Sequence, residues 1–451
     1  MPTREVRDPV HGFIELEDEE WSLVDTPVFQ RLRGIRQLAL ATLVYPGATH
    51  TRFEHSLGVR HVAGRMAQRL ELTDPEQRLV RRAALLHDVG HGPFSHISEE
   101  ALELINQAEN KSLNVDLPIH EVISHRIIRA DEQINRHMAS EFVESIIDVL
   151  SEKASKSVLS DIVTGPVDAD KQDYLLRDSL ACGVEYGHYD IDRLRNTMRT
   201  IQDSYDTHIA FSEGGVQALE QFVLAKYYMN SQVYRHRIRR ITDAMILRAL
   251  YLGATKDEIK YIRDLFIYDE DDKYLELYST SDDLKLTALS REKCHAASWF
   301  SKIFNMLSSR NLLKEVFAIR VDDLQANVRG VLAGRVAQVL VSKIEQEVAD
   351  ILECQAETVV FHDYTIGSTF GERGSSEANL QIVAGSDGEV FADRSVIFGS
   401  IQSAVQERWI SVYGIPNYDD STPAGREAGS SARDRIRDVI EASLVEGANK
   451  N

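Results

Sequence analysis

Histidine and aspartate side chains recur in three short motifs of the first 180 residues. His87 and Asp88 are adjacent in the stretch AALLHDVGH, His55 lies upstream in TRFEHSLG, and several aspartates follow in VDADKQDY. Imidazole nitrogens and carboxylate oxygens together make mixed ligand sets for divalent cations, which leave coordination positions for water and substrate. Two imidazoles and two carboxylates aimed at one ion are typical of a metallohydrolase.

The predicted helices around these residues would direct the polar groups inward. His87 and Asp88 continue the apolar rows of residues 79–86, on the side opposite to Arg78, Arg81 and Arg82, which are expected to face water. A buried carboxylate costs several kcal/mol unless it is paired or coordinates a metal. Backbone hydrogen bonding at a capped helix end is the alternative interpretation.

His55 favours metal ligation over that alternative. Thr51 to Glu54 fits a capping box, so a helix should begin there, and His55 then shares one face with Val59 and Val62. Two helices that each deliver a histidine inward indicate a shared ligand site. The pattern leaves open which of the later aspartates completes the site.

Several cationic or hydroxyl side chains could serve a phosphorylated substrate. Lys226 and Tyr234 lie two turns apart on a predicted long helix over 216–251, Lys171 adjoins the later aspartates, and Arg52 lies one turn before His55. A metal with several cations neutralises phosphate oxygens and the charge that develops in a transition state. For any one of these residues, a solvated surface position is the alternative.

Three histidines are acid–base candidates, because imidazole titrates near neutrality and can donate a proton to a leaving alkoxide. His91 and His96 fall in the Gly-Pro turn directly after the metal pair, and His120 follows. Five other histidines have no comparable context and are interpreted as structural: His11, His50, His61, His125 and His137.

Composition narrows the class of protein. The 451 residues carry a formal charge of −20, which opposes a nucleic-acid role because tracking a phosphate backbone needs a basic stripe. No apolar run approaches the roughly 20 residues of a membrane helix, and the N-terminus lacks a signal-peptide core. Three widely spaced cysteines, Cys182, Cys294 and Cys354, fit a reducing, cytoplasmic location.

The order of patterns predicts a mainly α protein with a smaller C-terminal α+β lobe. Residues 1–20 are expected to be extended with a turn in DPVHG, and helical periodicity dominates from 21 to 250. Strand-like runs at 316–321, 358–364 and 388–391 surround a helix over 330–352. The expected division is 1–260 for the helical catalytic core, 261–417 for the lobe, with regulatory and oligomer contacts, and 418–451 for a flexible linker (418–433) and a last helix.

Six motifs in fixed order carry a resemblance to a known family. They are DPVHG, FQRLR, YPGA, RFEHSLG, HDVGHGPFSH and DADK, spread over about residues 4–250, with an echo in RNL at 310–312. Together they closely resemble the HD-domain deoxynucleoside triphosphate triphosphohydrolases, including the animal enzyme that carries a SAM domain before its HD domain. No SAM-like segment precedes the match. The resemblance implies a helical HD-domain core.

The resemblance also implies roles for individual residues. The implied metal ligands are His55, His87, Asp88 and Asp170. His91, His96 and His120 would lie beside the α-phosphate, with His96 as the proton donor to the sugar O5′. The residues implied to hold phosphates are Arg52, Lys171, Tyr174 and Lys226, and those implied to surround the sugar are Gln37, Leu38, Asp178 and Tyr234. Water would attack the α-phosphorus of a dNTP and release a deoxynucleoside and inorganic triphosphate.

The family often uses an allosteric guanine-nucleotide site between subunits of a tetramer. Asp25, Gln30 and Arg33 match its guanine-reading residues, and Arg4, Arg237 and Arg310 fall near its phosphate-contacting positions. The resemblance thus implies GTP or dGTP as activator and a homotetramer, reached through a dimer. Two departures stand out: Lys226 replaces an arginine, and Ser212 and Gly214 replace the basic residues of a second regulatory site.

Two other functions remain open at this stage. One is an HD phosphohydrolase or phosphodiesterase for another nucleotide or a nucleic-acid end, although His91 stands where many cyclic-dinucleotide enzymes have lysine. The other is a catalytically silent nucleotide-sensing scaffold. The ligand types suit Fe, Mn, Zn, Ni or Mg, so they do not identify the metal.

Overall fold

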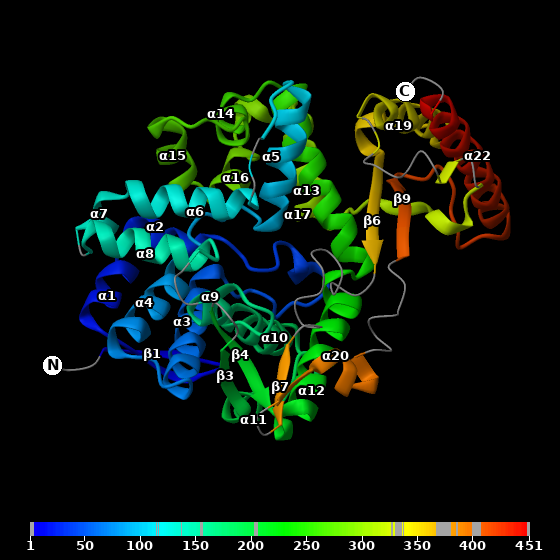
Figure 1. Ribbon diagram of the computed structural model, residues 1–451. Coiled ribbons are helices and arrows are strands. Elements are labelled where there is room, and N and C mark those ends of the chain that lie inside the picture. The colour runs from blue at the N-terminus through cyan, green and yellow to red at the C-terminus, as the bar shows by residue number, and fades with distance from the viewer. Residues whose placement is uncertain are drawn as a thin grey trace.

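The computed structural model describes residues 4–448 except for 114, 116, 137, 154–156, 203–205, 326, 327, 330–335, 337, 367–379, 385, 386 and 399–406. The described chain is mainly α-helical, as predicted, with three small sheets (Figure 1). His137, which the sequence suggested to be structural, lies outside the described residues.

Helices of the first two thirds of the chain surround the predicted site. Their bounds are α1 Asp18–Val24, α2 Pro27–Gln30, η1 Arg31–Gly34, η2 Ala41–Leu43, α3 Arg52–Arg69, α4 Asp74–Leu86, α5 His96–Ala108, α6 Ile119–Ala130, α7 Glu132–Asn135, α8 Ser140–Leu150, α9 Ser157–Thr164, α10 Ala169–Cys182, α11 Ile191–Thr197, η3 Glu213–Gly215, α12 Val216–Tyr228, η4 Met229–Tyr234, α13 Arg237–Thr255, α14 Lys260–Phe266, α15 Asp272–Ser279, α16 Asp283–Leu289, η5 Lys293–His295 and α17 Trp299–Ser308. At the centre, α3 packs against both α4 and α10.

Strands form three separate sheets. β1 (Arg4–Asp8) and β2 (Gly12–Leu16) make an N-terminal antiparallel hairpin. β3 (Met198–Gln202) and β4 (Thr207–Ser212) continue into β7 (Gln381–Ala384) and β8 (Asp387–Val390), with β4 and β7 parallel. β5 (Lys314–Arg320), β9 (Glu407–Gly414) and β6 (Val360–Ile366) form the third sheet, with β9 in the middle. The predicted strand runs are therefore confirmed.

The remaining helices lie in the C-terminal part: η6 Val321–Asp323, α19 Gln338–Leu352, η7 Ala356–Thr358, α20 Phe391–Arg394 and α22 Pro423–Ala448. α22 corrects a prediction, because most of the expected linker over 418–433 is helical. Its buried residues Ala432, Ile436, Ile440 and Leu444 follow one another at four-residue spacing and pack with the α19 and β5 side chains. The polar composition of this segment belongs to the exposed face of an amphipathic helix.

Two further predictions are corrected in the helices. The single helix expected over 216–251 is interrupted: α12 runs into the π-helical η4, and α13 begins only at Arg237. Arg81 and Arg82, expected to face water, are buried. Arg81 Nε donates to Glu20 Oε1 at 2.8 Å, and Arg82 pairs with Glu19, so α1 covers this side of α4.

Buried apolar side chains fall into two main groups. The larger one extends through α17 to Leu313 and also includes Ile382 of β7 and Phe391. The second comprises the third sheet with α19 and α22. A domain boundary at residue 260 would divide the larger group, because buried side chains of α14 to α17 and of β7 belong to it. The expected boundaries at 260 and 417 remain a prediction about independent units.

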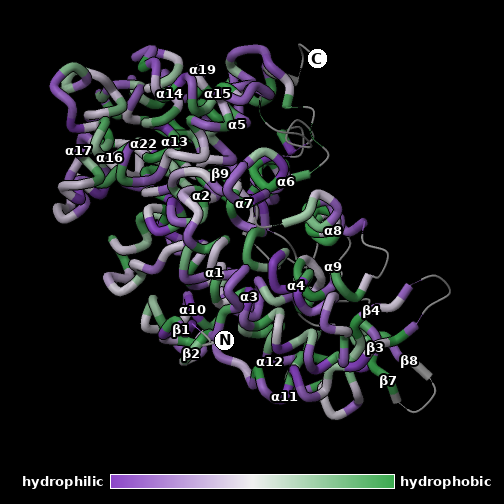
Figure 2. Tube along the Cα trace, turned by 90° about the vertical axis from the view of Figure 1, so that its left-hand side faces the viewer, coloured by the Kyte–Doolittle hydropathy of each residue, from purple (hydrophilic) through white to green (hydrophobic). Residues whose placement is uncertain are grey.

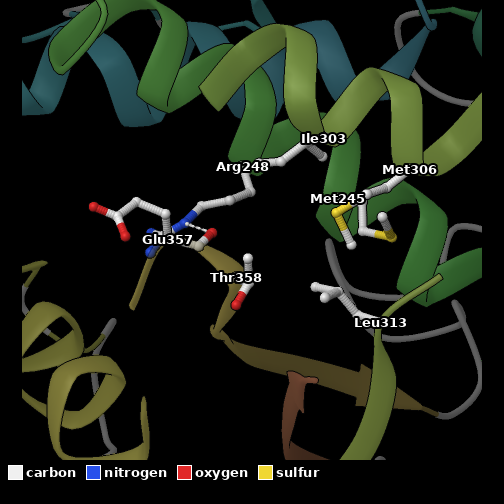
Figure 3. Close-up of a pocket in the computed structure, with 7 residues that line it drawn as sticks. All are labelled: Met245, Arg248, Ile303, Met306, Leu313, Glu357 and Thr358. Atoms are coloured by element: carbon white, nitrogen blue, oxygen red, sulfur yellow. Dashed lines mark hydrogen bonds between the residues drawn. The ribbon is translucent and has the colours of Figure 1, made fainter. Parts of the chain in front are cut away.

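Arg248 of α13 joins the two groups. Its NH1 atom lies 2.9 Å from Glu345 Oε2 of α19, and NH2 donates to the Ala356 carbonyl at 2.9 Å. A small pocket lies at this junction, and Met245, Arg248, Met306 and Thr358 are among the residues that line it (Figure 3). None of the predicted site residues lines it, so it belongs to the contact between the two groups.

Hydrophobic and hydrophilic residues alternate along most helices (Figure 2). Among the described residues, no helix combines the length and the apolar character needed to cross a lipid bilayer.

Candidate metal centre

Three helices deliver the four predicted metal ligands. α3 begins after the capping box between Thr51 and Glu54, which places His55 in its first turn. His87 caps the C-terminal end of α4, and Asp88 follows it. The third helix, α10, is capped by the side chain of Asp168, which accepts the Lys171 N–H and leaves Asp170 in the first turn.

The four side chains converge. His55 Nε2 lies 2.9 Å from Asp170 Oδ1 and 3.7 Å from Asp88 Oδ2. His87 Nε2 lies 3.3 Å from Asp88 Oδ1 and 3.8 Å from Asp170 Oδ1. One ligand atom each from His55, His87 and Asp170 fits within a 4.8 Å span, and Asp88 borders this group.

The donor atoms of this cluster fit a divalent cation. His55 Nε2 and His87 Nε2 are buried, and neither makes a hydrogen bond with any described residue, although both face carboxylates. Burial opposes a charged imidazole, but the nearby carboxylates of Asp170 and Asp173 prevail and raise the pKa of His55 to about 10. The carboxylates thus hold positive charge at this point, which a metal ion can supply in place of a proton.

Asp173 supports His55 from the opposite side of the ring. His55 Nδ1 donates to Asp173 Oδ2 at 2.8 Å, and Arg177 forms two hydrogen bonds to the same carboxylate. Asp173 can approach because α3 has a glycine there: a methyl group on Gly58 would overlap the carboxylate. The sequence interpretation offered Asp173 only as an alternative ligand, whereas its three-residue spacing from Asp170 fits this supporting position.

The turn after His87 and Asp88 is held in an unusual backbone conformation. Phe94 and Ser95 adopt positive φ values of 63° and 59°, which are uncommon for residues with side chains. Ser95 Oγ donates to the Arg36 carbonyl and accepts from Arg52 Nε, both at 2.8 Å. These contacts stabilise the strained turn, and strain of this kind concentrates at functional sites.

The three predicted acid–base histidines are gathered around Glu99. His91 stacks on His120 with ring centroids 4.1 Å apart, and His96 meets His91 edge to face at 5.2 Å. Glu99 accepts from His120 Nδ1 at 2.6 Å and from His96 Nδ1 at 3.0 Å. Although burial lowers the pKa of His120, the Glu99 hydrogen bond outweighs it, and the net pKa shift is upward. Glu99 is not among the predicted site residues, although its three-residue spacing from His96 places both on one face of α5.

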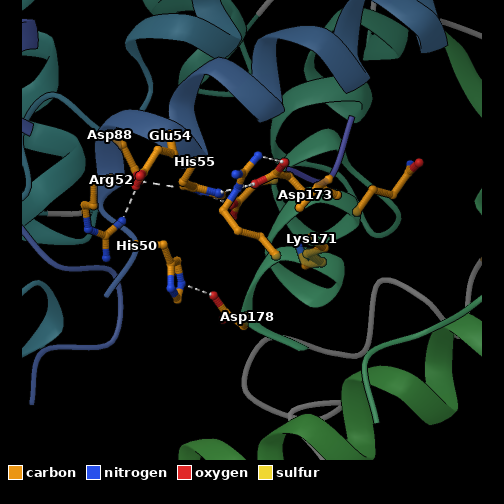
Figure 4. A network of polar contacts seen from close by, with 12 residues as sticks. His50, Arg52, Glu54, His55, Asp88, Lys171, Asp173 and Asp178 are labelled. Carbon is orange, nitrogen blue, oxygen red and sulfur yellow. Dashed lines mark hydrogen bonds and ion pairs between the residues drawn. The ribbon is translucent and has the colours of Figure 1, made fainter. Parts of the chain in front are cut away.

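The cluster of histidines continues directly into the ligand group. His91 Nε2 lies 3.3 Å from Asp88 Oδ1. Arg52 NH1 donates to Asp88 Oδ2 (Figure 4). Burial together with the nearby Arg52 and His120 lowers the pKa of His91 well below its usual value. Arg52 NH2 is buried and without a hydrogen-bond partner among the described residues, so it can bind an anion.

Residues predicted around the sugar form a second polar group. Asp178 accepts from Tyr234 Oη at 2.7 Å. It also accepts from His50 Nε2 at 2.7 Å (Figure 4). Tyr174 meets Tyr234 edge to face at 6.1 Å. Tyr234 also borders Leu38, which packs with Ala41 and Ala48. His50, interpreted as structural from the sequence, thus belongs to this group.

For three other predicted substrate residues, the structure gives their local surroundings. Gln37 has a buried Oε1 atom without a hydrogen bond among the described residues. The Lys171 ammonium donates to the Gly165 carbonyl at 3.0 Å and pairs with Asp168. Lys226 is 8% exposed on α12.

The residues predicted for nucleotide regulation are divided between two regions. Arg33 Nε donates to Gln30 Oε1 at 2.8 Å, next to Asp25 at the end of α1, and Arg4 stacks over Trp21 of that helix. In the described part of the chain, no hydrogen bond or ion pair connects these residues to the remaining two. Arg237 begins α13, and Arg310 donates to the Leu43 carbonyl.

Comparisons with known proteins agree with this architecture. The profile of the HD domain matches residues 52–178, and that of the HD associated region matches residues 189–428. An uncharacterized Bacillus subtilis protein, YwfO, is 35% identical over 57% of the chain and 57% of its own length. The Dictyostelium discoideum deoxynucleoside triphosphate triphosphohydrolase SAMHD1 homolog is 31% identical over 70% of the chain and 60% of its own length. The chain therefore spans less than two thirds of these curated relatives.

Two solved structures share the fold. A hypothetical protein from Aquifex aeolicus superposes with a TM-score of 0.68 at 26% identity, over 96% of this chain and all of that one. A phosphohydrolase from Bacteroides thetaiotaomicron superposes with a TM-score of 0.72 at 22% identity, over 92% of this chain and all of that one.

Proposed function

This chain belongs to the HD-domain family that carries an HD associated region, and we propose that it is a metal-dependent triphosphohydrolase of deoxynucleoside triphosphates. One observation carries the proposal: four ligand-type side chains from three helices converge beside a cluster of three histidines and a glutamate. Sequence similarity to deoxynucleoside triphosphate triphosphohydrolases supports the substrate class.

His55, His87, Asp88 and Asp170 would hold the metal. A divalent cation there would supply Lewis acidity toward a phosphoryl oxygen and help to activate water. Its identity among Fe, Mn, Mg, Zn and Ni is left open by this nitrogen–oxygen donor set.

The chain's own residues account for the remaining steps. Arg52, Lys171, Tyr174 and Lys226 bind the phosphates. Gln37, Leu38, Asp178 and Tyr234 surround the sugar, where Tyr234 crowds a ribose 2′-hydroxyl. Water attacks the α-phosphorus, and the bond from phosphorus to O5′ breaks.

His96 donates the proton that O5′ takes up, so that a deoxynucleoside and inorganic triphosphate leave. The side chain of His96 is 65% exposed. Its Nδ1 atom donates to Glu99, so Nε2 is the nitrogen that would face a substrate. His91 and His120 would stabilise the charge that develops on the α-phosphoryl oxygens.

GTP or dGTP would activate the enzyme by binding Asp25, Gln30, Arg33, Arg4, Arg237 and Arg310 between subunits of a homotetramer. A second regulatory nucleotide site would lack its expected basic side chains, because Ser212 and Gly214 occupy those positions.

The decisive experiment identifies the products. The protein is incubated with each dNTP and Mn²⁺ or Mg²⁺, with and without GTP, and products are separated by ion-exchange chromatography. Deoxynucleoside and inorganic triphosphate are expected. The variant carrying both His87→Ala and Asp88→Ala should lose bound metal and turnover.

Other products would redirect the proposal. A nucleoside monophosphate or a cleaved oligonucleotide would indicate a different phosphohydrolase, and tight nucleotide binding without any product would indicate a scaffold. Undiminished hydrolysis by the double variant would contradict the site assignment.

A further inference from the structure

The buried carboxylate of Asp173 connects the metal centre to the N-terminal hairpin. One face of Asp173 accepts from His55 Nδ1, as described above, and its Oδ1 atom lies 2.6 Å from His11 Nε2. The Asp173 side chain is fully buried, and that of His11 is 5% exposed. Arg177 NH1 continues the network to Asp8 Oδ2 at 2.8 Å.

The turn between β1 and β2 is built to present His11 in this position. Asp8 Oδ1 accepts the backbone N–H groups of Val10 and His11 at 2.9 and 2.8 Å. Gly12 then takes φ +78°, in the left-handed region that glycine adopts without strain. Asp8 therefore holds the turn with one oxygen and Arg177 with the other.

This geometry determines which nitrogen of His55 would face a bound metal. Nδ1 donates to Asp173, so Nε2, which points at Asp170 and Asp88, is the nitrogen that would bind the cation once its proton is displaced. Without His11 and Arg177, the Asp173 carboxylate would be free to rotate and would orient the imidazole less strictly. Loss of the group that directly holds a metal-binding histidine, here Asp173, typically lowers metal affinity 10- to 100-fold, and His11 acts through that group.

We propose that His11 is a positioning residue of the metal centre: the DPVHG turn fixes Asp173, and Asp173 fixes His55 in its metal-binding orientation. This inference rests on the proposed metal site, but it does not depend on the substrate. The N-terminal hairpin is thus part of the metal centre, although it contributes no ligand.

The test measures metal binding by the full chain without nucleotide. Metal-free protein is titrated with Co²⁺, and the visible absorption of the bound ion gives both Kd and coordination signature. His11→Ala should raise Kd about 10- to 100-fold, with an altered spectrum. His11→Gln can place an amide N–H near Asp173 Oδ1 and should restore Kd to within about threefold of the original protein.

A matched control separates this role from general loss of a histidine. His208 also pairs with an aspartate, Asp161, at 3.2 Å, but its side chain is 40% exposed and Asp161 is not one of the metal ligands, so His208→Ala should leave Kd and spectrum unchanged. Unaltered Co²⁺ binding by folded His11→Ala would overturn the inference. If His11→Ala does not fold, His11→Asn, which is too short to reach Asp173, is evaluated by the same two outcomes.

The same titration distinguishes failure of the inference from failure of the proposed site. If the variant carrying both His87→Ala and Asp88→Ala binds Co²⁺ as the original protein does, the four-residue centre itself is wrong, and the hairpin role falls with it. A change of Kd in His11→Ala, together with products other than triphosphate, would sustain the inference and reject only the substrate.

Discussion

Individual carboxylates in this molecule each serve more than one positive partner. Asp88 meets His55, His87, His91 and Arg52, and Asp173 holds two histidines and an arginine. In a buried setting an unpaired carboxylate is costly, so this sharing stabilises the charged forms. At the residue scale, the site is a set of shared charges whose geometry leaves two imidazole nitrogens free for a cation.

Glu99 offers a test of the histidine cluster at this scale. Glu99→Gln removes the charge that orients His120 and His96, so kcat should fall about a hundredfold, as expected for impaired general acid–base catalysis. KM for dNTP and Co²⁺ affinity should change by less than about threefold. Steady-state kinetics and the Co²⁺ titration measure both.

The matched control is Glu103→Gln, an exposed glutamate one turn further along α5, which should leave kcat unchanged. If Glu99→Gln lost metal affinity in proportion to kcat, Glu99 would be acting through the metal ligands and the assignment to the histidines would be wrong.

At the scale of elements, helix ends position the chemistry. The first turns of α3 and α10 and the last turn of α4 each deliver a ligand to the same point. In the hydrophobic interior, the position of α22 is determined by its buried residues, which lie along one face and pack against α19.

Ile440→Ala in α22 should destabilise the second hydrophobic group. Ile440 is fully buried, and removing a buried isoleucine side chain to alanine typically costs about 2–5 kcal/mol. Urea unfolding followed by circular dichroism measures the change. Arg435→Ala, on the exposed face of the same helix, should stay within about 0.5 kcal/mol of the original protein; an equal loss in both variants would contradict the predicted packing.

At the scale of the whole molecule, substitution of Arg33 tests whether a guanine nucleotide promotes association of subunits. Arg33→Ala should weaken GTP-dependent association by about 2 kcal/mol, or roughly thirtyfold, if arginine anchors the nucleotide between subunits. Sedimentation velocity with and without GTP or dGTP measures it, with exposed Arg291→Ala as control. Assembly of the unmodified protein that ignores both nucleotides would reject the regulatory assignment.

The pH dependence of stability also belongs to this scale. Burial and the nearby Arg240 and Arg235 lower the pKa of His362 to about 3. Because the unfolded chain binds this proton more tightly, the stabilising effect is complete above about pH 6.5 and declines as pH falls toward 3. His362→Gln should therefore reduce the loss of unfolding free energy between pH 7 and pH 5 by up to about 2 kcal/mol.

Urea titrations at the two pH values measure this difference. His188→Gln, a surface histidine whose side chain is 51% exposed, serves as control and should keep the original pH response. A His362→Gln variant that loses as much stability at pH 5 as the original protein would show that His362 does not carry the effect.

Local sequence patterns were sufficient to predict most of the secondary structure and the family of this protein. Helical periodicity, the capping box at Thr51 and the alternation of the strand runs determined element type, because these features depend on neighbours in sequence. The motif order also sufficed to recognise the HD-domain family. The inward direction of His55, His87 and Asp88 followed from the same helical spacing.

Only the tertiary structure decided which polar groups meet. Glu99, Asp173 and His11 each have partners on other elements, up to 162 positions away in sequence, and local spacing gives no sign of those partners. Arg81 was expected to face water for the same reason. The carboxylates that pair with its buried guanidinium are those of Glu17 and Glu20, at the start of α1. The polar composition of residues 418–433 likewise gave no indication of a helix, because the few apolar residues of this segment are stabilised only by packing against α19. Pairing across distant segments is a property of the packed chain, and no local spacing encodes it.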